Sequence, residues 1–223
     1  INQSPTEINQ SPTEINQSLK IFTDQKFEIE NVEKYNCRYT NKKNGFYQRV
    51  NVNTGKTIFK GNLIEGRLDG YGEMYHENGK LNYEGEWKNG GYDGQGKLYN
   101  EKGELIYEGE FKMESKCGQG KYYVNSILRY EGRYLNDERH GQGKLHDDNL
   151  KYEGEWKNDM RNGQGKSYNN GKLIYEGEWK NSERHGQGKY YVNSILRYEG
   201  KWLFDKQHGQ GKLYYANGNL KSE

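Results

Sequence analysis

The sequence predicts an all-β fold, an elongated single-layer twisted antiparallel sheet of tandem β-hairpins. Two observations lead to this prediction. The segment YEGEW, which begins at Tyr83, recurs with small variations at steps of 22 to 24 residues, and a period of this length indicates a repeat architecture. Within each copy, apolar residues stand at every second position, which is the periodicity of a β-strand.

The first strand of each hairpin carries Tyr-Glu-Gly or a variant of it. In one copy, Leu105, Tyr107, Gly109 and Phe111 occupy alternate positions, so we expect them on one face of the sheet. Seven copies are present, and they begin at Phe59, Tyr83, Tyr107, Tyr130, Tyr152, Tyr175 and Tyr198.

A G-x-G motif marks the second strand of each hairpin. It reads GYG at 70–72 and GQG in the six later copies. Alternation places Gly118 and Gly120 on one face, and Gln119 and Lys121 on the other. A short turn rich in Gly, Asn or Asp then leads into the next hairpin.

Glycine is unfavourable inside a strand, so its regular recurrence here needs a physical reason. We expect each glycine to leave room for a neighbouring Tyr or Trp ring to lie flat on the backbone. The positions that we expect to define the fold are Tyr83, Gly85, Trp87, Gly94, Gly96, Tyr107, Gly109, Phe111, Tyr152, Gly154, Trp156, Tyr175, Gly177, Trp179, Tyr198, Gly200 and Trp202.

Charged residues alternate with the apolar ones and belong to the opposite face. There, Glu110, Glu155 and Glu178 of first strands are expected to pair with lysines of second strands. Exposed cross-strand pairs contribute only about 0.2–1 kcal/mol each, so they would adjust register more than hold the fold. The lysines are Lys97, Lys121, Lys144, Lys166, Lys189 and Lys212.

The chain divides into four parts. Residues 1–18 repeat INQSPTE and are expected to be a disordered tail, because Pro5 and Pro12 forbid a continuous helix. Residues 19–34 are a capping or linking segment, either helix or strand. Residues 35–58 read as a degenerate copy, and residues 59–223 form the array.

The chain stops where a further copy should begin, and an open sheet edge is prone to association. We therefore expect a partner, another copy or more chain to cover that edge.

The run YEGEWKNGGYDGQGKLY, which begins at Tyr83, closely resembles the consensus of the MORN (membrane occupation and recognition nexus) repeat. The resemblance covers 59–215, and more weakly 35–58. It implies an elongated antiparallel sheet that serves as a scaffold, often in cilia, the cytoskeleton or membrane junctions. Phe111 and Tyr134 stand where the consensus has Trp, and Leu63 does so in the first copy. These replacements keep the position apolar.

Composition and motifs argue against several classes of function, including catalysis. The 34 basic and 32 acidic side chains nearly balance, so no strong field favours nucleic acid or an anionic membrane. The G-x-G motifs lie within strands and no helix follows, unlike a phosphate-binding loop. His140, His185 and His208 precede GQG and could suggest a metal site, but histidines of neighbouring hairpins would lie roughly 10 Å apart. The sequence predicts no enzyme activity, no cofactor and no metal.

One periodic feature favours protein binding. A tyrosine recurs on the charged face, once in most copies, and tyrosine is enriched at interfaces. Alternatively, each ring packs over the turn of its own hairpin. We expect a structural scaffold or adaptor in a large ciliary, axonemal or cytoskeletal assembly, inside the cell. The alternatives are a membrane-tethering or phospholipid-binding module, or the regulatory region of an enzyme whose catalytic domain lies elsewhere. The candidate partner-binding residues are Tyr75, Tyr99, Tyr123, Tyr168, Tyr191 and Tyr214.

Overall fold

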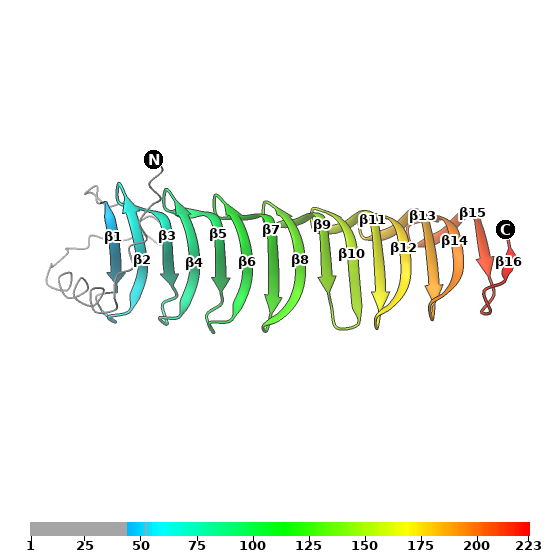
Figure 1. Cartoon of the computed structure of the whole chain (residues 1–223), viewed down its shortest axis with the longest axis horizontal. Coiled ribbons are helices and arrows are strands. Elements are labelled where there is room, and N and C mark those ends of the chain that lie inside the picture. Colours follow the sequence, from blue (N-terminus) through cyan, green and yellow to red (C-terminus); the bar gives the residue numbers. More distant parts are fainter. Residues whose placement is uncertain (1–43, 52) are drawn as a thin grey trace, which may run out of the picture. The chain divides into compact units, whose positions relative to one another are not determined.

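A computed structural model describes residues 44–51 and 53–223. They form one 16-stranded sheet in which every strand pairs with its neighbours in the chain, antiparallel throughout (Figure 1). The predicted fold class is confirmed. The strands are β1 (Gly45–Val50), β2 (Thr57–Ile64), β3 (Arg67–Tyr75), β4 (Leu81–Lys88), β5 (Gly91–Tyr99), β6 (Leu105–Lys112), β7 (Ser115–Val124), β8 (Ile127–Leu135), β9 (Glu138–His146), β10 (Leu150–Lys157), β11 (Met160–Asn169), β12 (Lys172–Lys180), β13 (Glu183–Val192), β14 (Ile195–Leu203), β15 (Lys206–Tyr214) and β16 (Leu220–Ser222).

The turn within each later hairpin consists of two residues with positive φ. Asn158 and Asp159 have φ of 50° and 63°. Such turns match the right-handed twist of the strands that they join. The backbone N–H of Asp159 also donates to the carbonyl of Arg139 in the preceding hairpin, at 3.1 Å. Neighbouring repeats are thereby linked along this edge of the sheet.

One face of the sheet holds a continuous aromatic core. Tyr175 contacts Trp179 of its own strand edge to face, with ring centroids 5.0 Å apart, and Trp202 of the next repeat at 5.5 Å. Because the tyrosines from Tyr83 to Tyr175 each lie between two such rings, the rows join into one cluster. The buried members are Phe59, Leu63, Leu68, Tyr83, Trp87, Tyr107, Phe111, Tyr130, Tyr134, Tyr152, Trp156, Tyr175, Trp179, Tyr198 and Trp202.

Paired glycines make room for these tyrosines. Gly177 pairs with Gly188 across β12 and β13. A Cβ added to Gly188 would lie 2.2 Å from the hydroxyl oxygen of Tyr175 and 2.5–2.6 Å from its ring carbons. The hydroxyl itself donates to the carbonyl of Glu178 at 2.9 Å. The predicted room for an aromatic ring is therefore confirmed at the second glycine of G-x-G, but the prediction was wrong at the first glycine where a Cβ would meet a glutamate, as at Gly94.

The N-terminal end of the chain lies partly outside the described residues, whereas the C-terminal end of the array is described. The expected tail at 1–18 and the capping segment at 19–34 are both outside them. Of the degenerate copy predicted at 35–58, β1 is described, and it pairs with β2. At the other end, β16 adds three residues to the edge of β15. That a partner covers this edge stays a prediction.

Candidate functional site

A ladder of glutamates and lysines runs across the face opposite the aromatic core. Strand pairing sets Glu108 between Lys97 and Lys121, and the same register recurs in the later repeats. Alternation fails once, between Glu73 and Glu84, which are direct cross-strand partners. The full ladder is Lys60, Glu73, Glu84, Lys97, Glu108, Lys121, Glu131, Lys144, Glu153, Lys166, Glu176, Lys189, Glu199 and Lys212.

The ion pairs of this ladder use a different glutamate from the predicted one. Lys121 lies 3.4 Å from Glu108, and Lys166 lies 3.3 Å from Glu176. The glutamate that directly follows the tyrosine of the first strand therefore pairs with lysine. The prediction that Glu110, Glu155 and Glu178 do so was wrong. Both glutamates recur with the period of the repeat, so the period alone does not show which of them pairs with lysine.

Glu178 instead supports a bulge in the second strand. The pairs Gly177↔Gly188 and Glu178↔His185 leave Gly186 and Gln187 without partners in β12. The backbone N–H of Gln187 donates to Oε1 of Glu178 at 2.7 Å. The same bond joins Gln95 to Glu86, Gln119 to Glu110 and Gln164 to Glu155. These carboxylates thus accept hydrogen bonds from backbone N–H groups that the pairing of the two strands leaves without partners.

The first glycine of each G-x-G has a role that the sequence analysis missed. Gly186 has a φ of +55°, and a Cβ there would lie 2.3 Å from the Glu178 carboxylate. Gly94 similarly faces Glu86 and not an aromatic ring. Both the left-handed backbone and the close carboxylate exclude other residues at the bulge.

The tyrosines predicted to bind a partner are tied to this ladder. The hydroxyl of Tyr99 donates to Glu84, and that of Tyr191 donates to Glu176, each at 2.7 Å. Tyr123 and Tyr214 make corresponding bonds to Glu108 and Glu199, whereas Tyr75 donates to Glu73 of its own strand. All six rings are half-buried, Tyr168 included. Each bonded tyrosine therefore braces its own repeat while part of its ring stays accessible.

These bonds shift the titration of both partners. Burial, and then the bond to Glu176, raises the pKa of Tyr191 to about 12. The Tyr191 hydroxyl in turn lowers the pKa of the Glu176 carboxyl below its ordinary value. Glu176 is therefore a stable carboxylate at neutral pH. This is the opposite of what a general acid requires.

A long groove follows the ladder. It has a volume of about 2430 Å³, and its lining extends from Tyr71 in β3 to Glu223. The lining consists of the paired glycines, the alternating Glu and Lys row, and the Gln row of the G-x-G motifs. The rings of Tyr99 and Tyr191 do not line it, but their hydroxyls bind glutamates that do. The groove can hold an elongated ligand with charges of both signs.

The histidines do not gather into a metal site. The described residues contain no group of three or more His, Cys, Asp or Glu side chains placed to hold a metal ion. His140 and His185 lie on β9 and β13, which are separated by the hairpins between them. Nδ1 of each is buried and has no hydrogen-bond partner among the described residues. Likewise, no helix in the described part of the chain could cross a bilayer.

The repeating geometry agrees with a family comparison. The family model described as "MORN repeat" matches residues 59–80, 83–104, 107–126, 130–149, 152–172, 175–194 and 198–220. The chain belongs to the MORN repeat family. Seven tandem MORN repeats thus account for β2 through the start of β16. No curated protein matches the chain closely enough to be reported as a relative.

Membership of this family sets the general class of function. MORN repeats are interaction modules that engage proteins or membranes, and they are generally not catalytic. In this MORN protein, the predicted Tyr-Glu-Gly and G-x-G motifs build both the groove and the aromatic core. The groove is the surface on which such an interaction is most readily placed, because it is concave and extends along the array.

Proposed function

We propose that this chain is a non-catalytic scaffold or adaptor that binds a protein partner along the groove, within a large ciliary or cytoskeletal assembly. The observation that carries the proposal is the groove itself, of about 2430 Å³, with regularly alternating charges and glutamates that bind the hydroxyls of half-buried tyrosines. A rigid sheet with a periodic surface suits an elongated polypeptide. Binding costs less when the surface is already ordered.

The charge pattern favours a protein over a lipid surface. Each lysine of the later ladder lies between two glutamates, as Lys121 lies between Glu108 and Glu131. An anionic membrane attracts clustered basic residues, at about 1 kcal/mol for each Lys or Arg. Here that attraction would be offset by the glutamates. A polypeptide with both signs of charge can match the alternation instead.

The carboxylates of the groove have structural partners, which supports a non-catalytic role. Glu176 holds Lys166 and the Tyr191 hydroxyl, and Glu108 holds Lys121 and the Tyr123 hydroxyl. A general acid would need a raised pKa, whereas the pKa of Glu176 is lowered.

A co-purification experiment tests the proposal. Wild-type protein and the variant with Tyr123→Ser, Tyr168→Ser and Tyr191→Ser are used as baits in native extract. We expect the variant to lose the recovered partners while circular dichroism shows an intact sheet. A control variant with Met113→Ser and Phe204→Ser changes two exposed residues at hairpin turns, 81% and 60% exposed, and should retain them. Equal recovery by all three baits would contradict a binding role for the tyrosines.

Sedimentation with vesicles distinguishes the membrane alternative. Phosphatidylcholine vesicles with and without phosphatidylserine are mixed with the protein at low and physiological salt. We expect no sedimentation with either. Salt-sensitive binding to the acidic vesicles would favour membrane tethering.

A tagged copy of the protein that stays outside cilia and cytoskeletal fractions would contradict the proposed location.

A further inference from the structure

A row of arginines lies over the aromatic core, on the face opposite the groove. The guanidinium carbon of Arg161 is 4.3 Å from the ring centroid of Trp179, which belongs to the next repeat. Arg139 stacks on Trp156, and Arg184 on Trp202, at the same distance. The three repeats therefore present the same cation over the same ring.

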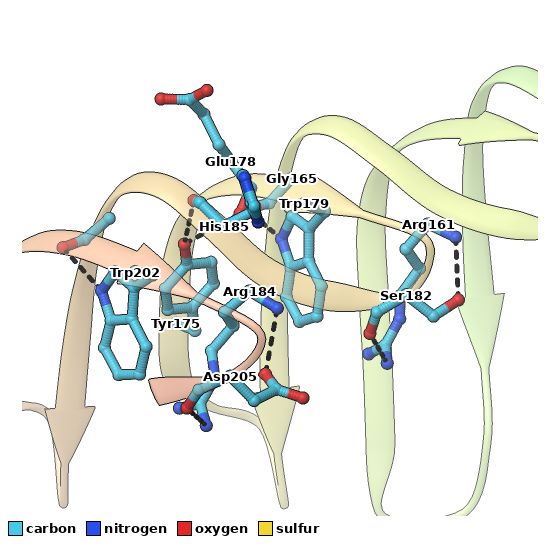
Figure 2. Close-up of polar contacts among 11 residues, drawn as sticks. Arg161, Gly165, Tyr175, Glu178, Trp179, Ser182, Arg184, His185, Trp202 and Asp205 are labelled. Carbon is cyan, nitrogen blue, oxygen red and sulfur yellow. Dashed lines mark hydrogen bonds and ion pairs between the residues drawn. The ribbon is translucent and has the colours of Figure 1, made fainter. Parts of the chain in front are cut away.

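Two of these arginines have a carboxylate partner and one does not. Nε of Arg184 donates to Asp205 at 2.8 Å, and Nε of Arg139 donates to Asp159 at 2.7 Å. For Arg161, the corresponding turn position in the next repeat holds Ser182. The Ser182 carbonyl accepts a hydrogen bond from Nη2 of Arg161 at 2.7 Å. Figure 2 shows the two arrangements side by side. Nε of Arg161 has no hydrogen-bond partner among the described residues.

The Arg161 guanidinium is also poorly solvated. Burial lowers its pKa from the ordinary value. An aspartate at position 182 would accept a hydrogen bond from Arg161, as Asp205 does from Arg184. Asp205 attracts this guanidinium, but no carboxylate among the described residues accepts a hydrogen bond from it, so an anion supplied from outside would stabilise it further.

A second departure from the repeat opens a hollow at the same place. Ser167 occupies the strand position that Leu145 and Tyr190 fill in the adjacent repeats, where each faces the tyrosine of its first strand. A hollow of about 520 Å³ lies at this position, and its lining includes Ser167, Arg161, Ser182, Tyr175 and Trp179 together with Leu145 and Tyr190. Ser167 and Ser182 thus place a short side chain and a guanidinium without a hydrogen-bonded carboxylate in one hollow, where Asp205 also attracts that guanidinium.

We propose that this hollow is a binding site for an acidic side chain of a partner protein, with the carboxylate on Arg161 and an adjoining apolar group in the space above Ser167. The planar guanidinium suits a carboxylate, and the walls formed by Tyr175 and Trp179 suit an apolar neighbour. Asp159 and Asp205 also line the hollow. They would repel a doubly charged phosphate more strongly than a single carboxylate.

The probe for this site is 3-phenylpropionate, which joins a carboxylate to an apolar ring. It is titrated into the full chain, and the indole N–H of Trp179 and the Nε–H of Arg161 are followed by NMR. We expect saturable shifts of both signals. The affinities of the neutral 3-phenylpropanamide and of inorganic phosphate should each be lower by at least about tenfold. The amide lacks the charge, and phosphate lacks the apolar group.

Two variants copy residues that the chain already uses in its other repeats. Ser182→Asp supplies the internal carboxylate, and Ser167→Leu fills the hollow, so both should fold and both should weaken the probe about tenfold or more. Asp137→Ser is the matched control, because Asp137 occupies the equivalent turn position beside Lys116 and does not line the hollow, and it should leave probe binding unchanged. Unchanged binding by Ser182→Asp, or equal binding of the amide or of phosphate, would overturn the proposal.

Discussion

The carboxylate of Glu178 lies directly over Gly186 and accepts the backbone N–H of Gln187 at 2.7 Å. This contact joins the two motifs of a MORN repeat, because the glutamate belongs to the first strand and the glycine to G-x-G. It explains why a glutamate recurs three residues after the tyrosine in several repeats. Arg133 and Lys201 stand at this position in two others.

Replacing Glu178 with alanine should lower the free energy of unfolding by about 1–2 kcal/mol. The variant loses a hydrogen bond to a charged acceptor, and water replaces it only in part at this half-exposed bulge. Chemical denaturation measures the difference. Lys201→Ala, at the equivalent position of the next repeat, is the control and should stay within about 0.5 kcal/mol of wild type. Equal losses in both variants would show that the bulge does not depend on the carboxylate.

The strands and their faces could be predicted from the sequence, but the partner of Glu178 could not. Period-two alternation and the spacing of Tyr83 from Gly85 and Trp87 fixed which residues are buried. The bulge shifts the register of β12 and β13 at Gly186 and Gln187, while both residues still pair normally with β14. Because alternation is unbroken along β13, nothing in the residue pattern reveals the shift.

The hollow at Arg161 illustrates a second limit on what the sequence can predict. A repeat consensus predicts what the copies share, and so it predicts the Tyr-over-Gly core. Ser167 and Ser182 are departures from that consensus, and neither residue type is unusual on its own. Only the fold shows that the two departures meet at one arginine.

Gly188→Ala should destabilise the sheet by about 1–3 kcal/mol or more, because the added methyl group overlaps the ring of the buried Tyr175. Gly91 is a matched control, since its φ is also outside the left-handed region and a Cβ there meets only the flexible side chain of Glu114. Gly91→Ala should change stability by less than about 0.5 kcal/mol. Thermal unfolding of both variants compares them. Similar melting temperatures would argue against a steric role for Gly188.

Alkaline pH should weaken the array between about pH 10 and 12. The folded protein holds the Tyr191 proton up to a pKa of about 12, against 10.0 for an ordinary tyrosine. In that window the unfolded chain has already lost the proton, so stability falls as pH rises. Glu176→Gln removes the charge next to Tyr191 and should lower its pKa towards 10. Ultraviolet titration of tyrosinate measures this. Glu178→Gln is the control, and an equal change in both variants would contradict the assignment.

Trp179→Phe should lower the free energy of unfolding by about 1–3 kcal/mol. The indole Nε1 donates to the carbonyl of Gly165 at 3.2 Å in a buried position, and phenylalanine leaves that carbonyl without this partner as well as losing contact area. Stacking of Arg161 is weakened too, because tryptophan is the best ring for a cation. The repeat with Phe111 shows that phenylalanine is compatible with the fold, so the variant should remain folded and its loss should be measurable by urea denaturation. A change below about 0.5 kcal/mol would contradict a stabilising role for the indole hydrogen bond and for the extra ring area.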